Sequence, residues 1–449
     1  MEGMEGRHLI ADLDTFLAAR EQELIGLRRD LHAYPEPGYA ERRTTRLIAH
    51  RLAEAGLRPR ILPKGTGLIV DIGDWGSAGG TGGGEPPVRG GTPGGRPPGQ
   101  APVVALRADL DALPMTDEKD VPYRSTVPGA CHACGHDVHT TVLLGTGLFL
   151  DEQARAGLLP GPVRLIFQSA EEIGTGAMDV IDAGGLGSVG RIFALHCDPR
   201  LDVGMIGVRA GPITAACDLI KVTLNGPGGH TARPHLTADV VYALGKIVTE
   251  LPAALSRRVD PRSSLSLVWG RISAGFAANA IPDEGIAEGT VRCLDAEAWD
   301  SAAGLVEELV HSVAAAYGVK ADLEYVRNVP PTVNEEASAQ MFAAGAAGVL
   351  GADSVVSTAQ SLGGEDFAWY LSSVPGALAR LGTRTPGTRV VRDLHQPTFD
   401  VDERAIGVGI RVMAATALTA ASGGSPDHPF SRLPAGQEEQ ETARTTVVQ

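Results

Sequence analysis

The sequence has few aromatic residues and no concentration of positive charge. Phe, Trp and Tyr make up only 4% of its 449 residues, too few to form a surface on which nucleic-acid bases would stack. The formal net charge is -15 at pH 7, and no basic block offsets it. Such a charge disfavours binding to nucleic acid or to an anionic membrane. We therefore expect neither as a partner.

Cysteine is also scarce, and long apolar runs are missing. The five cysteines are an odd number spread over a long chain, which is unlike a disulfide framework and indicates a reducing compartment. Residues 1–20 lack the apolar core and cleavage site of a secretory signal, and no uninterrupted apolar run approaches the length of a membrane span. We expect a cytoplasmic protein.

The total length and two polar stretches indicate how the chain is divided. A chain of 449 residues is long for one hydrophobic core, which favours two domains. Residues 74–99 are dominated by Gly and Pro and offer little to bury, so we expect a flexible surface insertion there. Residues 422–449 are polar, and we expect a disordered tail.

Residues 133–139 (ACGHDVH) concentrate the groups that bind divalent metals. Cys134, His136, Asp137 and His139 fall within six residues, and Gly135 lets the backbone turn so that Cys134 and His136 can converge on one ion. The apolar residues that follow have helical spacing. The sequence therefore predicts a metal-binding loop that leads into a buried helix.

Two residues of this region allow other interpretations. Cys131 and Cys134 form a C-x-x-C pair, which in a cytosolic protein can be a redox site. We favour a packed thiol at Cys131, since free cysteine often behaves as a small buried hydrophobe. His139 lies one helical turn beyond His136 and is either a further ligand or a core histidine; we favour the second.

Between residues 103 and 195, short apolar runs alternate with patterns of helical spacing. Residues 103–106, 163–167 and 192–195 are short continuous apolar runs, typical of strands covered on both faces. Strand and helix in alternation predict an α/β fold with a mostly parallel sheet covered by helices. Ligands bind at the carboxyl ends of such strands. The residues found there are Asp109, Asp111, Glu171, Glu172 and His196.

Residues 213–328 follow a different pattern. They read as β-α-β-β-α-β, the order of a ferredoxin-like α+β domain, inserted into the larger one. Its sheet edge and helices would suit a dimer contact. We therefore predict a catalytic domain formed by residues 1–212 and 329–421, and a dimerisation or lid domain formed by residues 213–328.

The candidate ligands are too many for one closed structural zinc site. A thiolate, three imidazoles and a carboxylate suit an open pair of divalent ions, which about 3.5–4 Å apart can activate water and polarise a carbonyl together. Glu171, beside a ligand, would then be available to move a proton from water to a leaving nitrogen. The predicted ligands are Cys134, His136, Glu172, His196 and His395.

Eight short stretches, in order along nearly the whole chain, resemble one family. The chain is similar to the aminoacylase and carboxypeptidase-like metallopeptidases, in particular to the amidohydrolase branch that contains hippurate hydrolases and plant auxin-conjugate hydrolases. The matching stretches are LRADLDALP (106–114), HACGHDVH (132–139), SAEEIG (169–174), LH (195–196), GPGGHTARPH (226–235), NAIP (279–282), GTVR (289–292) and LHQP (394–397).

The resemblance implies a set of roles. The five ligands would bind two divalent ions, of manganese, zinc or cobalt, and Glu171 would be the general base and acid. The inserted domain would form a homodimer, in which His230 reaches the partner subunit's site to stabilise the oxyanion and Asn279 helps to hold the substrate. Cys131 departs from the family's pattern, in which methionine is common at this position.

These observations lead to one leading hypothesis and two alternatives. We expect hydrolysis of the amide bond in N-acyl or N-aroyl amino acids, which releases a carboxylic acid and a free amino acid. A dipeptidase or carboxypeptidase of the same fold is the alternative within the class. A thiol–disulfide redox protein is the alternative from another class, and it would bind little metal.

Overall fold

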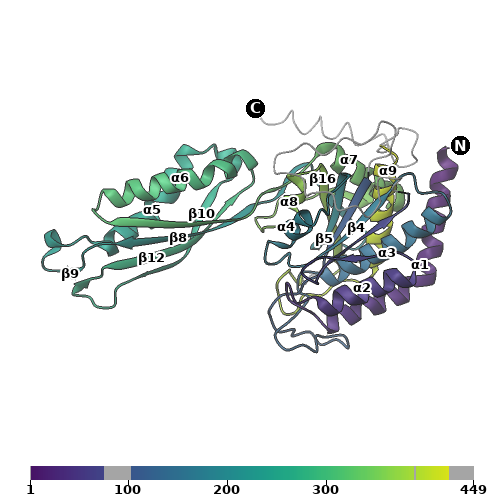
Figure 1. Cartoon of the computed structure of the whole chain (residues 1–449), viewed down its shortest axis with the longest axis horizontal. Coiled ribbons are helices and arrows are strands. Elements are labelled where there is room, and N and C mark those ends of the chain that lie inside the picture. The colour runs from purple at the N-terminus through teal and green to yellow at the C-terminus, as the bar shows by residue number, and fades with distance from the viewer. Residues whose placement is uncertain (1, 75–102, 389–390, 424–449) are drawn as a thin grey trace. The chain divides into compact units, whose positions relative to one another are not determined.

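The computed structural model describes residues 2–74, 103–388 and 391–423, and it divides the chain into two compact units (Figure 1). Unit 1 comprises Met1–Gly211, Asn334–Ala359 and Tyr370–Gln449, and unit 2 comprises Pro212–Val333 and Gln360–Trp369. The expected flexible insertion (74–99) and disordered tail (422–449) fall almost entirely outside the described residues.

Unit 1 contains an eight-stranded sheet in the order β1-β2-β4-β3-β5-β16-β6-β15. The four central strands β4, β3, β5 and β16 run parallel, whereas β1, β2 and β6 each pair antiparallel with a neighbour. All seven residues of β3 are buried, as a strand covered on both faces requires. The strands are β1 Arg60–Ile61, β2 Leu68–Ile72, β3 Val103–Asp109, β4 Val163–Gln168, β5 Val189–Asp202, β6 Ile206–Val208, β15 Val355–Ser357 and β16 Gly376–Arg384.

Helices pack against this sheet and against one another. In one core cluster, apolar side chains of α1, α3 and α9 meet those of the central strands. Helix α9 is long and apolar enough to cross a membrane, but 78% of it is buried inside the structure, as in the core helix of a globular unit. The helices are α1 Glu2–Ala33, α2 Arg42–Glu54, α3 His136–Arg155, α4 Gly176–Asp182, α7 Glu336–Leu350 and α9 Arg404–Ala421. The short helix α8 (Ala368–Leu371) begins in unit 2 and ends in unit 1.

Unit 2 has the predicted β-α-β-β-α-β order. Its four-stranded antiparallel sheet runs β10-β12-β8-β13, and one face is covered by α5 and α6 around a separate apolar core. Residues alternate between buried and less buried along β8, as expected for a sheet with one open face. The elements are β8 Ala216–Asn225, α5 Val240–Arg258, β10 Ser266–Ala274, β12 Glu284–Cys293, α6 Ala296–Ala315 and β13 Lys320–Val329.

Two short ladders complete the fold. Strands β9 (Gly229–His230) and β11 (Ala280–Ile281) pair antiparallel, and β7 (Gly211–Thr214) pairs with β14 (Thr332–Asn334).

Residues 329–333 and residues 360–369 lie in a different unit from the one that the sequence predicted. Both segments belong to unit 2, whereas the prediction placed them in the catalytic domain. The cause for residues 360–369 is a set of long-range contacts: Ser361 exchanges backbone hydrogen bonds with Ile213 and Ala215, and the Trp369 ring lies 6.2 Å from the Trp299 ring. These contacts join segments far apart in sequence, so a local sequence pattern does not predict them.

Candidate metal centre

The first two predicted ligands lie where a tight loop becomes a helix. Gly135 has φ 90°, a left-handed conformation, and it precedes the first residue of α3, His136. A Cβ atom at this position would lie 2.7 Å from the Cys197 sulfur. Only glycine therefore allows both the turn and the close packing that bring Cys134 and His136 to the same side.

The other three predicted ligands come from segments that are remote in sequence. Glu172 lies in the turn after β4, and His196 lies within β5, the neighbour of β3 on the opposite side from β4. His395 has φ 60°, and its N–H donates to the carbonyl of Ala133 at 2.8 Å. This bond ties the His395 segment directly to the metal-binding loop.

The ligand atoms of these residues converge. Cys134 Sγ lies 3.5 Å from His196 Nε2, and His395 Nε2 lies 3.4 Å from Glu172 Oε1. His136 Nε2 lies 3.9 Å from oxygens of both Glu171 and Glu172. Three overlapping groups, each with ligand atoms within 4.8 Å of one another, connect all five predicted ligands and Glu171. The structure thus brings the six residues together in unit 1.

Hydrogen bonds orient the imidazole rings toward the centre. His136 Nδ1 lies 2.9 Å from the carbonyl of Asp111, and His196 Nδ1 lies 2.8 Å from the carbonyl of Cys197. A carbonyl only accepts, so both Nδ1 atoms must donate and Nε2 of each neutral ring keeps its lone pair. Asp111 also accepts the Glu172 N–H at 3.0 Å and thereby holds a third ligand.

His139 lies near the centre but is occupied by the protein itself. Its Nδ1 lies 2.6 Å from Asp109 Oδ1, and its Nε2 accepts the N–H of Cys197 at 2.8 Å. Both nitrogens therefore have protein partners, and no lone pair is left for an ion. His139 is a core histidine, as we favoured, and its partner Asp109 is held in turn by Arg107 at 2.7 Å.

The donor set fits divalent cations. His136 Nε2 and Glu172 Oε1 are buried and have no hydrogen-bond partner, although each faces other candidate ligands. Burial and the carboxylates of Glu172 and Glu171 raise the pKa of the Cys134 thiol well above its usual value. Burial alone would lower the pKa of His136, but Asp109, Asp111 and Glu172 outweigh it and raise the pKa to about 10. Positive charge at this position would compensate the acidic groups and favour the thiolate.

Cys131 is a packed thiol. It is fully buried, and the five cysteines are all free. The Lys119 ammonium lies 3.6 Å from its sulfur, yet burial raises the pKa of the thiol to about 11. A thiol with such a pKa reacts slowly in disulfide exchange, which argues against the redox interpretation of Cys131 and Cys134.

His230 and Asn279 lie beside each other in unit 2. His230 pairs with Ala280 across the β9–β11 ladder, and the Thr231 N–H donates to the carbonyl of Asn279 at 3.2 Å. The exposed His230 ring accepts the Ala232 N–H on Nδ1 at 3.0 Å, so the neutral ring carries its proton on Nε2. The Nε2–H group can therefore donate a hydrogen bond to a group that does not belong to the backbone of unit 2.

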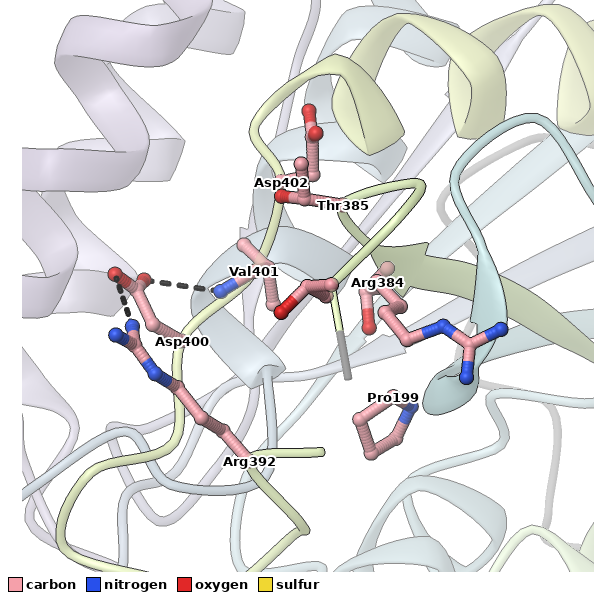
Figure 2. A pocket seen from close by; sticks show the side chains of 9 residues that line it. Pro199, Arg384, Thr385, Arg392, Asp400, Val401 and Asp402 are labelled. Atoms are coloured by element: carbon pink, nitrogen blue, oxygen red, sulfur yellow. Dashed lines mark hydrogen bonds and ion pairs between the residues drawn. The ribbon is translucent and has the colours of Figure 1, made fainter. Parts of the chain in front are cut away.

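A pocket of about 340 Å³ in unit 1 contains none of the predicted site residues (Figure 2). Its charged groups are already paired: Arg384 lies 2.6 Å from Asp202, and Arg392 lies 3.8 Å from Asp400. Figure 2 shows Asp400 turned toward Arg392 and the Val401 N–H. We therefore do not assign the chemistry to this pocket.

One residue that contacts the site was missed by the sequence analysis. The buried Glu41 accepts the N–H of Ala170, the residue before Glu171, at 2.8 Å. The sequence separation is 129 residues, and an acidic residue next to a helix start predicts only a local cap. No sequence signal separated it from an ordinary solvated glutamate.

Comparisons with known proteins agree with this geometry. A family model described as peptidase family M20/M25/M40 matches residues 105–419. A Bacillus subtilis protein named N-acetyl-L-cysteine deacetylase is 37% identical over 87% of this chain and 86% of its own length. An Arabidopsis thaliana protein named IAA-amino acid hydrolase is 32% identical over 88% of this chain and 84% of its own length.

Two further matches, to a sequence and to a crystal structure, show how much of each protein the similarity covers. A Rhodococcus jostii protein named as a glutamate–cysteine ligase is 44% identical over 88% of this chain, but the chain spans only 46% of that protein. The crystal structure of a dinuclear metal-binding peptidase from Bacillus subtilis has a TM-score of 0.74 and 33% identity, and the match covers 90% of this chain and 99% of that one.

Proposed function

The chain belongs to the peptidase family M20/M25/M40, and on that premise we propose that it hydrolyses the amide bond of N-acyl or N-aroyl amino acids. The products are a carboxylic acid and a free amino acid. One observation carries the proposal: a cysteine thiol, three imidazoles and a carboxylate gather within reach of one another, with Glu171 at their side. The relatives named as a deacetylase of N-acetylcysteine and as a hydrolase of IAA-amino acids support the acyl-amino acid class.

We propose that two divalent ions, of manganese, zinc or cobalt, are bound by these side chains. The donors are mixed sulfur, nitrogen and oxygen, which suits such metals better than magnesium or calcium. When bound, the ions polarise the amide carbonyl and make water acidic enough to deprotonate near neutral pH. The proposed ligands are Cys134, His136, Glu172, His196 and His395.

The protein's own groups then move the protons and stabilise charge. Glu171 takes a proton from the attacking water and passes it to the amide nitrogen as that nitrogen leaves. His230 donates a hydrogen bond from Nε2–H to the carbonyl oxygen as negative charge develops there, and Asn279 helps to hold the substrate. We propose that His230 acts on the site of the partner subunit in a homodimer.

A substrate panel tests the proposal. Purified protein is assayed with benzoylglycine, N-acetylcysteine and other acetylated amino acids, and with the corresponding unblocked dipeptides. We expect kcat/KM for the acylated substrates to exceed that for the dipeptides by at least about tenfold, because an additional charged amino group must be desolvated or paired at the site. Preferential turnover of unblocked dipeptides would favour the peptidase alternative instead.

A further inference from the structure

An N-terminal segment of unit 1 packs directly onto the turn that carries Glu171 and Glu172. We call residues 170–175 the acid turn. The Tyr39 hydroxyl lies 2.7 Å from Thr175 Oγ1, and a Cβ atom at Gly38 would lie 2.6 Å from Ile173 Cδ1. Glu41 accepts the N–H of Ala170 at 2.8 Å. The segment from Gly38 to Glu41 therefore contacts the acid turn at its start, middle and end.

Glu41 does not serve its own helix. It occupies the N-cap position of α2, yet its side chain makes no capping hydrogen bond. Glu36 supplies the cap instead, since its two carboxylate oxygens accept the N–H groups of Arg43 and Thr44 at 2.9 and 2.8 Å. A glutamate at a helix start normally satisfies the first-turn donors. Here Glu36 accepts the first-turn N–H groups of α2, and the Glu41 carboxyl group contacts the acid turn instead.

The residue that Glu41 holds has an unusual backbone conformation. Ala170 is buried and has φ 55°, in the left-handed region that residues with a Cβ rarely adopt. Its conformation sets the direction in which the chain leaves β4 and enters Glu171. A strained residue keeps such a conformation only when its surroundings fix it. The Glu41 bond to its N–H is one such constraint, and the Gly176 N–H donating to its carbonyl at 3.3 Å is another.

The carboxyl group of Glu41 is itself unfavourably placed. It is fully buried, Oε2 has no hydrogen-bond partner, and burial raises its pKa to about 7. A buried group of this kind costs stability unless its contact serves another purpose. One oxygen of a carboxyl group accepts hydrogen bonds whether or not the group is protonated, so the contact with Ala170 does not depend on the charge.

We propose that Glu41 is a positioning residue, which holds Ala170 so that Glu171 and Glu172 face the candidate metal centre. This inference rests on the proposed function, because it assigns Glu171 to proton transfer. Glu41 touches no candidate ligand side chain in the described contacts, and it acts through the backbone of the acid turn.

Three substitutions separate position from charge. Glu41→Gln keeps a carbonyl oxygen at the same reach, so we expect kcat within about threefold of wild type. Glu41→Asp keeps the charge but withdraws the acceptor by one methylene, and Glu41→Leu removes it. We expect both to lower kcat by about tenfold or more with KM changed less than twofold, because small displacements of catalytic groups are costly. If Glu41→Leu does not fold, Glu41→Asp carries the test.

The test of Glu41 also includes a measurement other than activity and a matched control variant. Hydrogen exchange of the amides in residues 170–176 should be faster in Glu41→Asp than in wild type or Glu41→Gln. Glu335→Leu is the control: Glu335 is also an N-cap residue of unit 1 and accepts a backbone N–H, that of Ser338 at 2.7 Å, but its contacts lie outside the acid turn. It should lower the melting temperature and leave kcat unchanged.

The outcomes distinguish this inference from the proposed function. Full activity in Glu41→Asp with loss in Glu41→Gln would mean that charge matters instead of position, and would overturn the inference. Wild-type kcat and exchange in all three variants would overturn it as well. In either case a Glu171→Gln variant without turnover would leave the proposed function standing, whereas an active Glu171→Gln variant would refute that function whatever Glu41 does.

Discussion

Glu171 lies beside the candidate ligands, with one oxygen 3.9 Å from His136 Nε2, and is not itself one of the five. We expect Glu171→Gln to retain bound metal and to lose about 10²–10⁴-fold in kcat, the usual contribution of a general base. Steady-state kinetics together with metal analysis of the variant checks this. Normal hydrolysis by the variant would remove Glu171 from the mechanism.

Single residues of the centre were predictable to different degrees. Cys134, His136, Glu172, His196 and His395 stood out because their side chains are the usual ligands of divalent ions and because parallel sheets bind ligands near the carboxyl ends of their strands. The predicted strand end at His196 was wrong, since β5 continues to Asp202. Orientation was not predictable. The carboxylates of Asp109 and Asp111 were recognised only as strand-end acids, and their hydrogen bonds to histidine rings depend on packing between residues 30 and 25 positions apart.

At the scale of elements, the start of α3 depends on Gly135. Its φ of 90° is costly for any residue with a Cβ, and the added atom would meet Cys197. We expect Gly135→Ala to lower the free energy of unfolding by about 1–3 kcal/mol and to reduce metal affinity. Urea unfolding and metal titration check this. Gly157→Ala is the control for φ alone, since Gly157 has φ 73° and a Cβ atom there would have nothing within 4 Å.

The loop before the metal-binding stretch contains a carboxylate whose stability contribution depends on pH. Burial would raise the pKa of Asp117, but the His32 ring nitrogen 3.3 Å away and hydrogen bonds from Ser125 and Lys119 outweigh it and hold the pKa well below its ordinary value. Asp117 therefore stabilises the fold above its unfolded-state pKa of about 4, and this contribution is lost as pH falls toward the lower folded-state value.

Asp117→Asn should consequently destabilise the protein by about 1–3 kcal/mol at pH 7, and the difference from wild type should shrink between pH 5 and pH 3. Urea unfolding with metal removed from both proteins measures it, and the exposed Asp300 provides an Asp→Asn control. A difference that stays constant or grows on acidification would be inconsistent with the depressed pKa.

Helices and strands were predicted well where the local spacing of apolar residues distinguishes one from the other. The six elements of unit 2 follow from alternating and helical apolar patterns. Residues 360–369 were misassigned because Ser361 and Trp369 find their partners in unit 2 through contacts that no local pattern encodes.

At the scale of the whole molecule, the site residues are divided between the two units. The candidate ligands and Glu171 lie in unit 1, and His230 and Asn279 lie in unit 2. The α/β class and the ferredoxin-like insertion were predicted from sequence and are confirmed. The homodimer stays a prediction, since it concerns a second copy of the chain.

Mixing two inactive variants tests whether His230 acts across such a dimer. Glu171→Gln and His230→Ala should each be inactive as homodimers. A mixed dimer would contain one site with both an intact Glu171 and an intact His230, so coexpression should restore activity of up to about a quarter of wild type if subunits assemble at random. Absence of restored activity in a mixture shown to contain mixed dimers would mean that His230 does not act on the partner's site.

The central claim is that five side chains hold a pair of divalent cations. Plasma mass spectrometry of the protein, purified with manganese or zinc in the medium, measures it directly. We expect about two ions per chain in wild type and in Cys131→Ala, and clearly fewer in Cys134→Ala. A wild-type protein that binds one ion or none under these conditions, or a Cys134→Ala variant with the full wild-type content, would contradict the account.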